Sequence, residues 1–197
     1  MIDTQKIKAL REATGASMVD CQKILAKTKG DFEAAKKILS EKSKRAVGKK
    51  TGRLTSEGIV EAYIHSNRKI GALVELACET DFVAKNPLFL ELAHNIAMHI
   101  AAANPLCVDS PEFHPEILAR IEEEKKKALA EFGGKKPKEM IENIIAGKIK
   151  KYTASVSLLS QEYVKDPQKT VGDIINETIA KIGENIRVKR FCRFQIE

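Results

Sequence analysis

The chain has 197 residues, of which 43% are hydrophobic and 31% charged, a composition typical of a globular protein with a buried core. It has no apolar run near the roughly 18 residues that span a bilayer and no basic stretch followed by an apolar one at its start, so we expect neither a membrane helix nor a secretory signal. The four cysteines are widely separated, which argues against a zinc site or a disulfide framework and favours a reducing cytoplasm.

The net charge of +7 is concentrated near the N-terminus. Residues 1–55 hold 14 Lys and Arg against 6 Asp and Glu, whereas residues 56–197 hold the other 20 against 21. A basic quarter of this kind indicates either an arm that binds nucleic acid or a small module that docks on an acidic protein. Phe32 is the only aromatic residue in it, so we favour docking on a protein and keep RNA or ribosome binding as the alternative.

Residues 1–45 are predicted to form a small module of three helices. Capping residues are expected at the three helix starts: Asp3, Ser17 and Asp31. The first two helices should end at Gly15 and Gly30. Apolar residues recur at helical spacing in the second and third helices: Met18, Cys21, Leu25, Phe32, Ala35, Ile38 and Leu39. Because a module of this size buries little apolar surface, we expect it to be mobile relative to the rest of the chain.

Residues 46–56 are predicted to be a basic linker. Like charges and glycines in and just before this stretch disfavour compact packing: Lys42, Lys44, Arg45, Gly48, Lys49, Lys50, Gly52 and Arg53.

Residues 57–197 are predicted to form an α+β core domain. Two strands, over residues 57–65 and 70–78, flank a polar turn. Alternation places one set of residues on a buried face: Ile70, Ala72, Val74, Leu76 and Cys78. The C-terminal stretch also alternates and should join this hairpin through Ile186, Val188, Cys192, Phe194 and Ile196.

Helices should cover this sheet. One is capped by Asn86, begins at Pro87 and carries an inward row: Phe89, Leu92, Ala93, Ile96, Ala97 and Ile100. A second covers residues 116–132, and a third starts at Pro137 with an inner face of Met140, Ile141, Ile144, Ile145 and Ile149. A fourth runs from Thr170, paired with Asp173, to Gly183. The predicted fold class is thus α+β: a three-helix module, then a small antiparallel sheet packed against helices.

The sequence contains none of the common catalytic motifs. A phosphate-binding GxxxxGK[ST] loop, a GxSxG elbow and an HExxH pair are all absent. His94 and His99 would point about 140° apart on a helix, so we expect solvent or groove positions rather than a shared metal. Cys21 and Cys78 lie on apolar faces and are predicted to be buried. We therefore predict no enzyme activity, no catalytic residue, no metal and no cofactor.

The connection from Glu79 to Asn86 is unusual because Phe82 and Val83 follow Asp81 directly, where loops favour small polar residues. In one interpretation Phe82 folds back over the sheet and Asp81 bonds turn amides. In the other, Phe82 projects as an anchor for a partner's pocket. Spacing alone favours the first.

Three stretches resemble the elongation factor Ts family: Glu75-Leu76-Ala77-Cys78-Glu79-Thr80-Asp81-Phe82-Val83-Ala84-Lys85-Asn86, Leu10-Arg11-Glu12-Ala13-Thr14-Gly15-Ala16-Ser17-Met18-Val19-Asp20-Cys21, and, more weakly, Ala180-Lys181-Ile182-Gly183-Glu184-Asn185-Ile186. They lie near both ends and the middle, so the resemblance covers essentially the full chain. Ala77 departs from the Asn or Val more usual in the family, a packing detail.

The resemblance implies a guanine-nucleotide exchange factor for the GTPase elongation factor Tu. A tip of four residues would enter near the partner's switch region and displace elements that hold Mg²⁺: Thr80, Asp81, Phe82 and Val83. The N-terminal module, similar to ubiquitin-associated three-helix domains, would contact the partner's nucleotide-binding domain through Leu10, Arg11, Thr14, Gly15, Met18 and Val19. The resemblance implies no membrane partner, and we expect no direct binding to nucleic acid.

The chain is also short for that family, whose longer members have two related core subdomains. The resemblance implies that short members compensate by forming homodimers. Cys192, on the terminal strand, would lie at such an interface; a buried reduced thiol is the alternative.

Overall fold

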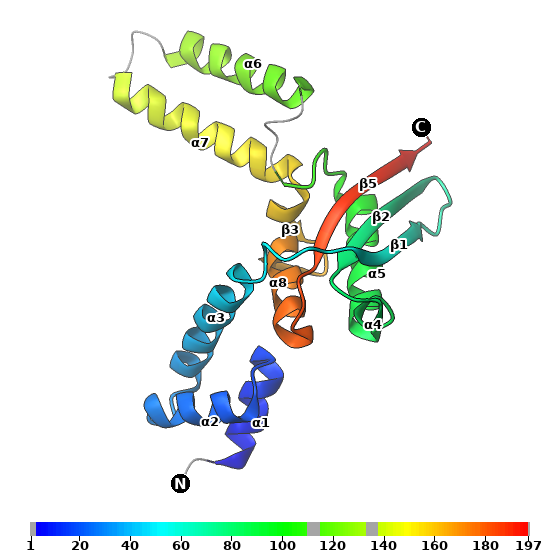
Figure 1. Cartoon of the computed structure of the whole chain (residues 1–197). Helices are drawn as coiled ribbons and strands as arrows, with labels where there is room; N and C mark the ends of the chain where they lie inside the picture. The colour runs from blue at the N-terminus through cyan, green and yellow to red at the C-terminus, as the bar shows by residue number, and fades with distance from the viewer. Residues whose placement is uncertain (1–2, 110–114, 133–137, 197) are drawn as a thin grey trace.

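The structure is a computed structural model that describes residues 3–109, 115–132 and 138–196 (Figure 1). Ile2 and Pro137, which the sequence places at two helix starts, lie outside the described residues. Within the described ranges, no helix is long and apolar enough to cross a membrane.

Three helices form the N-terminal part: α1 (Thr4–Thr14), α2 (Met18–Lys27) and α3 (Phe32–Gly48). The three predicted caps are confirmed, because each side chain accepts a backbone N–H of the following turn: Asp3 from Gln5, Ser17 from Asp20, and Asp31 from Ala34. Helix α2 ends three residues before the predicted Gly30. The intervening residues form a turn that closes with the N–H of Gly30, at φ 84°, donating to Leu25 O.

Helix α3 continues to Gly48, beyond the boundary at residue 45 that the sequence predicts. Lysines on a solvated helix face repel each other only weakly, because water and salt screen them. The end of the helix also has an apolar anchor, since Val47 is buried in the main core cluster. The first part of the expected linker is therefore helical and packed.

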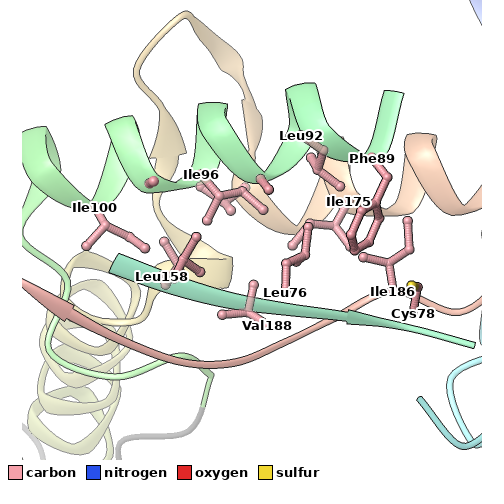
Figure 2. Packing of buried hydrophobic residues seen from close by; sticks show 14 of the residues in the cluster. Leu76, Cys78, Phe89, Leu92, Ile96, Ile100, Leu158, Ile175, Ile186 and Val188 are labelled. Atoms are coloured by element: carbon pink, nitrogen blue, oxygen red, sulfur yellow. The ribbon is translucent and has the colours of Figure 1, made fainter. Parts of the chain in front are cut away.

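The main sheet has three antiparallel strands in the order β1 (Glu57–Ile64), β2 (Ile70–Cys78) and β5 (Arg187–Gln195). The predicted hairpin, its buried face and the addition of the C-terminal strand are all confirmed. Helices α5 (Pro87–Ala103) and α8 (Val171–Ile182) pack on one face of the sheet. Figure 2 shows Phe89, Leu92 and Ile96 of α5 directed toward Leu76 and Val188 of the strands.

A β-bulge in β5 corrects the predicted alternation of the C-terminal strand. Glu75 pairs with Arg190 and Leu76 with Val188, so Lys189 is an extra residue on the β5 side. One extra residue exchanges the two faces of the strand beyond it. Residues before the bulge are buried as predicted, whereas three residues after it are exposed rather than inward: Cys192, Phe194 and Ile196.

Helices α6 (Pro115–Phe132) and α7 (Lys138–Val156) form a hairpin that extends away from the sheet (Figure 1). Charge pairs lie along α6, for example between Lys125 Nζ and Glu122 Oε1 at 2.6 Å. On α7 the predicted inner residue Met140 is half exposed, because the neighbouring Ile141 takes the buried position. Three short elements were not predicted: η2 (Leu158–Ser160), β3 (Glu162–Tyr163) and β4 (Asp166–Thr170).

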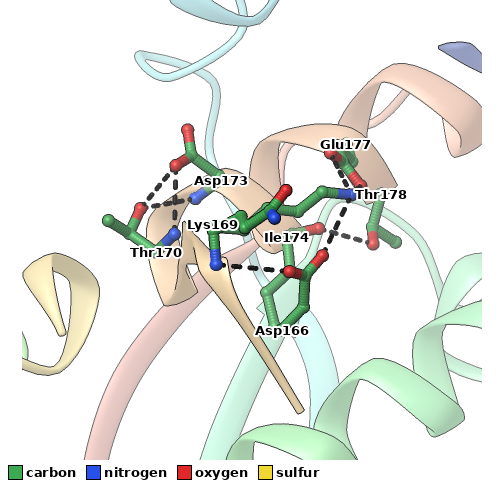
Figure 3. A network of polar contacts seen from close by, with 8 residues as sticks. Asp166, Lys169, Thr170, Asp173, Ile174, Glu177 and Thr178 are labelled. Carbon is green, nitrogen blue, oxygen red and sulfur yellow. Dashed lines mark hydrogen bonds and ion pairs between the residues drawn. The ribbon is translucent and has the colours of Figure 1, made fainter. Parts of the chain in front are cut away.

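Helix α8 starts and ends where the sequence predicts. The Thr170 hydroxyl accepts the Asp173 N–H at 3.1 Å, and the Asp173 carboxylate accepts the Thr170 N–H at 3.1 Å (Figure 3). Lys169 bridges Glu177 of α8 at 2.8 Å and Asp166 at 4.0 Å. Together these contacts fix the first half of α8 against β4.

His99 is fully buried, which corrects the expected solvent or groove position. Its Nδ1 accepts the Val164 N–H at 3.3 Å, so Nε2 carries the proton and donates to Gln161 Oε1 at 3.0 Å. Burial lowers the pKa of His99 below its ordinary value, with the Gln161 bond acting in the opposite direction. The ring therefore joins α5 to the β3–β4 hairpin in its neutral form.

Candidate partner-binding site

The segment between β2 and α5 contains a single helical turn, α4 (Asp81–Ala84). Thr80 caps it, its hydroxyl accepting the Val83 N–H at 3.4 Å. Val83 is buried in the core cluster, and a neighbour one residue away on a helix points about 100° elsewhere. Phe82 is accordingly 82% exposed. The interpretation in which Phe82 folds back over the sheet is wrong.

A carboxylate from a distant segment holds this turn in place. Glu184, just after α8, accepts the Thr80 N–H at 3.1 Å on one oxygen and the Thr80 hydroxyl at 2.8 Å on the other. Hydrogen bonds to a charged acceptor are about twice as strong as neutral ones. The residue that precedes the exposed turn is therefore fixed at both its backbone and its side chain.

The neighbouring residue, Asn185, is fully buried and extends the same set of contacts. Its N–H donates to Glu79 Oε1 at 2.6 Å, and Arg53 Nη1 lies 3.5 Å from that oxygen. Its Nδ2 donates to the backbone oxygens of Thr51 at 3.4 Å and Arg53 at 2.9 Å. We call these contacting residues the anchor cluster: Arg53, Glu79, Thr80, Glu184 and Asn185.

The contacts of Glu184 and Asn185 are not predicted by the sequence, although both residues lie in the third stretch that resembles a known family. The local pattern, an acid and an amide directly after the glycine that ends α8 at φ 95°, does not show which distant residues they bond.

Asp81 is ionised at the exposed end of the turn. Its carboxylate lies 2.9 Å from Lys85 Nζ, and this hydrogen bond holds the pKa of Asp81 below its usual value and raises that of Lys85. Both side chains are solvated, and exposed pairs of this kind contribute little to stability. The carboxylate can therefore exchange Lys85 for another positively charged group at small cost.

The residues predicted to act in the N-terminal module are distributed between its interior and its surface. Leu10 is fully buried in a cluster of the module's own: Ile7, Leu10, Cys21, Leu25, Ala35 and Leu39. Thr14 is half-buried and donates to Leu10 O at 2.6 Å. Arg11, Met18 and Val19 are exposed.

Gly15 lies where the module meets α8. Its φ of 67° is the left-handed conformation that favours glycine, and an added Cβ would be 2.9 Å from Lys181 Cγ. Lys181 is three residues before Glu184. The last turn of α8 therefore meets the N-terminal module, and Glu184, just after the helix, bonds the residue that caps the turn carrying Phe82.

The uncovered side of the sheet is apolar around the β1–β2 turn. We call it the outer sheet face, defined by the exposed residues Val60, Ile64, Leu73, Cys192 and Phe194. Because Cys192 is exposed, its interpretation as a buried thiol is wrong. Cys21 and Cys78 are buried as predicted, and burial raises the pKa of Cys78 to about 11.

Among the described residues, no group of three or more His, Cys, Asp or Glu side chains could hold a metal ion. What the site offers is an exposed aromatic ring and a carboxylate on a fixed turn.

Comparison with known proteins gives a consistent result over nearly the whole chain. Residues 8–197 match the family model described as "Elongation factor TS". "Elongation factor Ts" of Thermoanaerobacter sp. (strain X514) is 50% identical over 195 residues, which are 99% of this chain and 95% of that protein. The proteins of the same name from Desulfosudis oleivorans and Rubrobacter xylanophilus are 47% and 44% identical, over 99% and 98% of this chain and 98% and 97% of their own lengths.

Proposed function

The chain belongs to the elongation factor Ts family, and we propose that this translation elongation factor is a guanine-nucleotide exchange factor for the GTPase elongation factor Tu. It binds the GDP-bound GTPase in the cytoplasm, disturbs the site that holds Mg²⁺ and the phosphates, and promotes replacement of GDP by GTP. The observation that carries the proposal is Phe82, an apolar side chain held in solvent on an anchored turn. Exchange needs no covalent chemistry, so the factor is not an enzyme in that sense.

The working part in this proposal is the tip, Thr80 to Val83. Phe82 enters an apolar pocket beside the switch region of the GTPase and brings the Asp81 carboxylate with it. Thr80 and Val83 stay with the factor, one bonded to Glu184 and the other buried in the core. The charge of Asp81 or the volume of the tip then displaces groups that hold Mg²⁺, which weakens the hold on GDP.

The energies require more than the tip. Accelerating GDP release by about 10³–10⁴-fold takes roughly 4–5.5 kcal/mol, at about 1.4 kcal/mol per tenfold. Burying one phenylalanine side chain provides only about 1.5–3 kcal/mol. The rest must come from docking of the other surfaces. Linkage makes the effect reciprocal. Because the factor weakens the binding of nucleotide to the GTPase, bound nucleotide weakens the binding of the factor by the same amount and helps to release it.

Docking is proposed to use two arms. The module of residues 1–45 contacts the nucleotide-binding domain of the GTPase through Met18, Val19 and Arg11, which are exposed. Leu10, Thr14 and Gly15 shape that surface from within or from the side facing α8. The core of residues 57–197 reaches another domain of the same partner, and residues 46–56 join the two arms.

We also propose that the outer sheet face pairs two copies of the chain. Exposed apolar side chains on neighbouring strands are expensive to leave in water, and a second copy presents a complementary surface by symmetry. Cys192 lies within this face, where a thiol from each copy could meet.

Release of fluorescent GDP from elongation factor Tu tests the function. We expect wild type to accelerate release strongly and Phe82→Ala to lose about tenfold or more of that acceleration, the equivalent of one lost apolar anchor. Leu129→Ala is a matched control, because Leu129 is 53% exposed on α6, in the hairpin that extends away from the sheet and from the tip (Figure 1).

The two failures have different meanings. If wild type does not accelerate release, the proposed function is wrong. If Phe82→Ala is fully active while wild type accelerates release, the function stands and the role of the tip is wrong.

A further inference from the structure

Leu54 is a large apolar side chain with 90% of its surface exposed. Single exposed leucines are common on protein surfaces and need no special explanation. Leu54 differs from such residues because the backbone next to it is bonded by Asn185, the neighbour of the residue that holds the tip.

The backbone before Leu54 is fixed by two hydrogen bonds of one residue. The Arg53 N–H donates to Lys50 O at 2.9 Å, and the Arg53 carbonyl accepts Nδ2 of the buried Asn185 at 2.9 Å. The Arg53 side chain also lies 3.5 Å from the Glu79 carboxylate. The backbone of Arg53 is therefore held at both its N–H and its carbonyl, which restricts the backbone of Leu54 as well.

The backbone after Leu54 is fixed as well. Thr55 is buried, and Glu57 pairs with Cys78 as the first rung of the β1–β2 ladder. Folding has already ordered this backbone, so a partner that buries Leu54 does not have to order it again. An exposed apolar side chain on ordered backbone is therefore buried at a lower entropic cost than one on a mobile segment.

Leu54 and Phe82 are held by the same anchor cluster. Asn185 bonds the backbone next to Leu54, and Glu184 bonds the residue two before Phe82. The two side chains also flank the same end of the β1–β2 hairpin, because Leu54 is three residues before Glu57 and Phe82 is four after its partner Cys78. A protein that receives one of them is therefore bound at the end of the hairpin from which the other segment leaves.

We propose that Leu54 is a second apolar anchor, which fills a pocket on the same GTPase that receives Phe82. The proposal rests on the exchange function above and assigns different roles to the two side chains: Leu54 contributes affinity, and Phe82 acts at the nucleotide site. Leu54 has no acidic neighbour in sequence and no part in α4, so it contacts the partner in the same way whether or not the nucleotide is bound. Binding that is equal in both states changes the concentration dependence of a reaction and leaves its saturated rate unchanged.

The test measures GDP release from elongation factor Tu over a range of factor concentrations. For Leu54→Ala, we expect the concentration for half-maximal release to rise about tenfold or more, with the rate at saturation unchanged. Leu54→Met keeps the apolar volume and should stay within about threefold of wild type. Leu129→Ala, which removes the same side chain from a leucine that is 53% exposed on α6, should match wild type.

Stability separates docking from folding. Because Leu54 is almost wholly solvated, Leu54→Ala should unfold at the wild-type temperature. The inference is overturned if Leu54→Ala shows the wild-type concentration dependence, or if it lowers the saturated rate instead. Both results require wild type to be active; an inactive wild type would overturn the proposed function and not this contact alone.

Discussion

At the scale of single residues, the tip depends on one carboxylate from the other end of the chain. Glu184 accepts both hydrogen bonds that Thr80 can donate, and nothing else in the described part of the chain bonds those two donors. Removing the acceptor leaves half-buried donors without partners, which costs more than a hydrogen bond contributes when it is present. Glu184 therefore holds the residue that caps the tip, although it lies more than 100 residues further along the chain.

Glu184→Ala is expected to lower the free energy of unfolding by about 1–3 kcal/mol and to reduce the acceleration of GDP release. Urea denaturation and the GDP release assay measure the two effects. Glu177→Ala is the control, since its exposed pair with Lys169 should be worth less than about 1 kcal/mol. Equal effects of the two substitutions would show that the contacts of Glu184 do not position the tip.

His99 gives the fold a pH dependence with a definite sign. Burial lowers the pKa of His99 in the folded state, whereas the unfolded chain titrates near the ordinary value of about 6.5. As the pH falls below about 6.5, the unfolded state binds more protons, and stability decreases by at most about 1.4 kcal/mol per pH unit. Above that pH, His99 is unprotonated in both the folded and the unfolded state, so its contribution to stability does not change with pH.

Denaturation at a series of pH values from 7 to 5 checks this expectation. His99→Gln should remove a large part of the slope in this range, whatever its effect on absolute stability. His94→Gln should retain the slope, because it leaves the buried ring of His99 and its contacts with Gln161 and Val164 in place. A wild-type slope in His99→Gln would contradict the assignment.

At the scale of the elements, the sequence predicted what local chemistry determines. Helix starts at Asp31, Asn86 and Thr170 are correct because a side chain three or fewer residues away must satisfy the free N–H groups of the first turn. The bulge at Lys189 was not predictable in this way, because an extra polar residue among polar neighbours leaves the hydrophobic pattern unchanged until the strands are paired. His99 was misplaced for a similar reason: its partners, Gln161 and Val164, are more than 60 residues away.

In the candidate site, too, local features were predictable and contacts between distant residues were not. Spacing suggested that Phe82 folds back, since no local pattern reveals that Val83 occupies the buried position. The resemblance to a family predicted a projecting tip instead, and Phe82 is exposed. The anchor cluster could not be found from either, because it joins Arg53, Glu79 and Asn185 from three parts of the chain.

Gly58 allows a test of how closely β1 and β2 approach. It has a φ of 154°, and an added Cβ would lie 2.3 Å from the Leu76 carbonyl oxygen, which is backbone and cannot move aside. Gly58→Ala should reduce the free energy of unfolding by about 2 kcal/mol or more, measured by thermal or urea denaturation. Gly48→Ala is the control: nothing lies within 4 Å of the added atom at this helical position, so stability should stay equal or rise by up to about 1 kcal/mol.

At the scale of the whole molecule, the outer sheet face is the large apolar surface that the fold leaves uncovered. The bulge in β5 creates part of it, because without the extra residue Cys192 and Phe194 would face the core. The bulge thus supplies the proposed pairing surface as well as shaping the strand.

Phe194→Ser is expected to shift the chain toward the monomer, raising the dissociation constant of the dimer by about tenfold or more. Sedimentation equilibrium under reducing conditions measures this without a contribution from Cys192. Leu129→Ser should associate like wild type, since Leu129 is outside the outer sheet face. A monomeric wild type would sink the pairing proposal, as would unchanged association of Phe194→Ser.

Helix α3 begins in the N-terminal module and ends with Val47 in the core, so one continuous rod of 17 residues, about 25 Å long, joins the two arms. Rotation and translation along such a rod are coupled. Adding one residue would turn the module by about 100° and change the direction in which Met18 and Val19 face, whereas adding seven would nearly restore that direction and move the module about 10.5 Å further out. The length of α3 can therefore change only in steps of about seven residues, nearly two turns, if both arms are to meet one partner. The number of residues in this segment is thus more restricted than their identity.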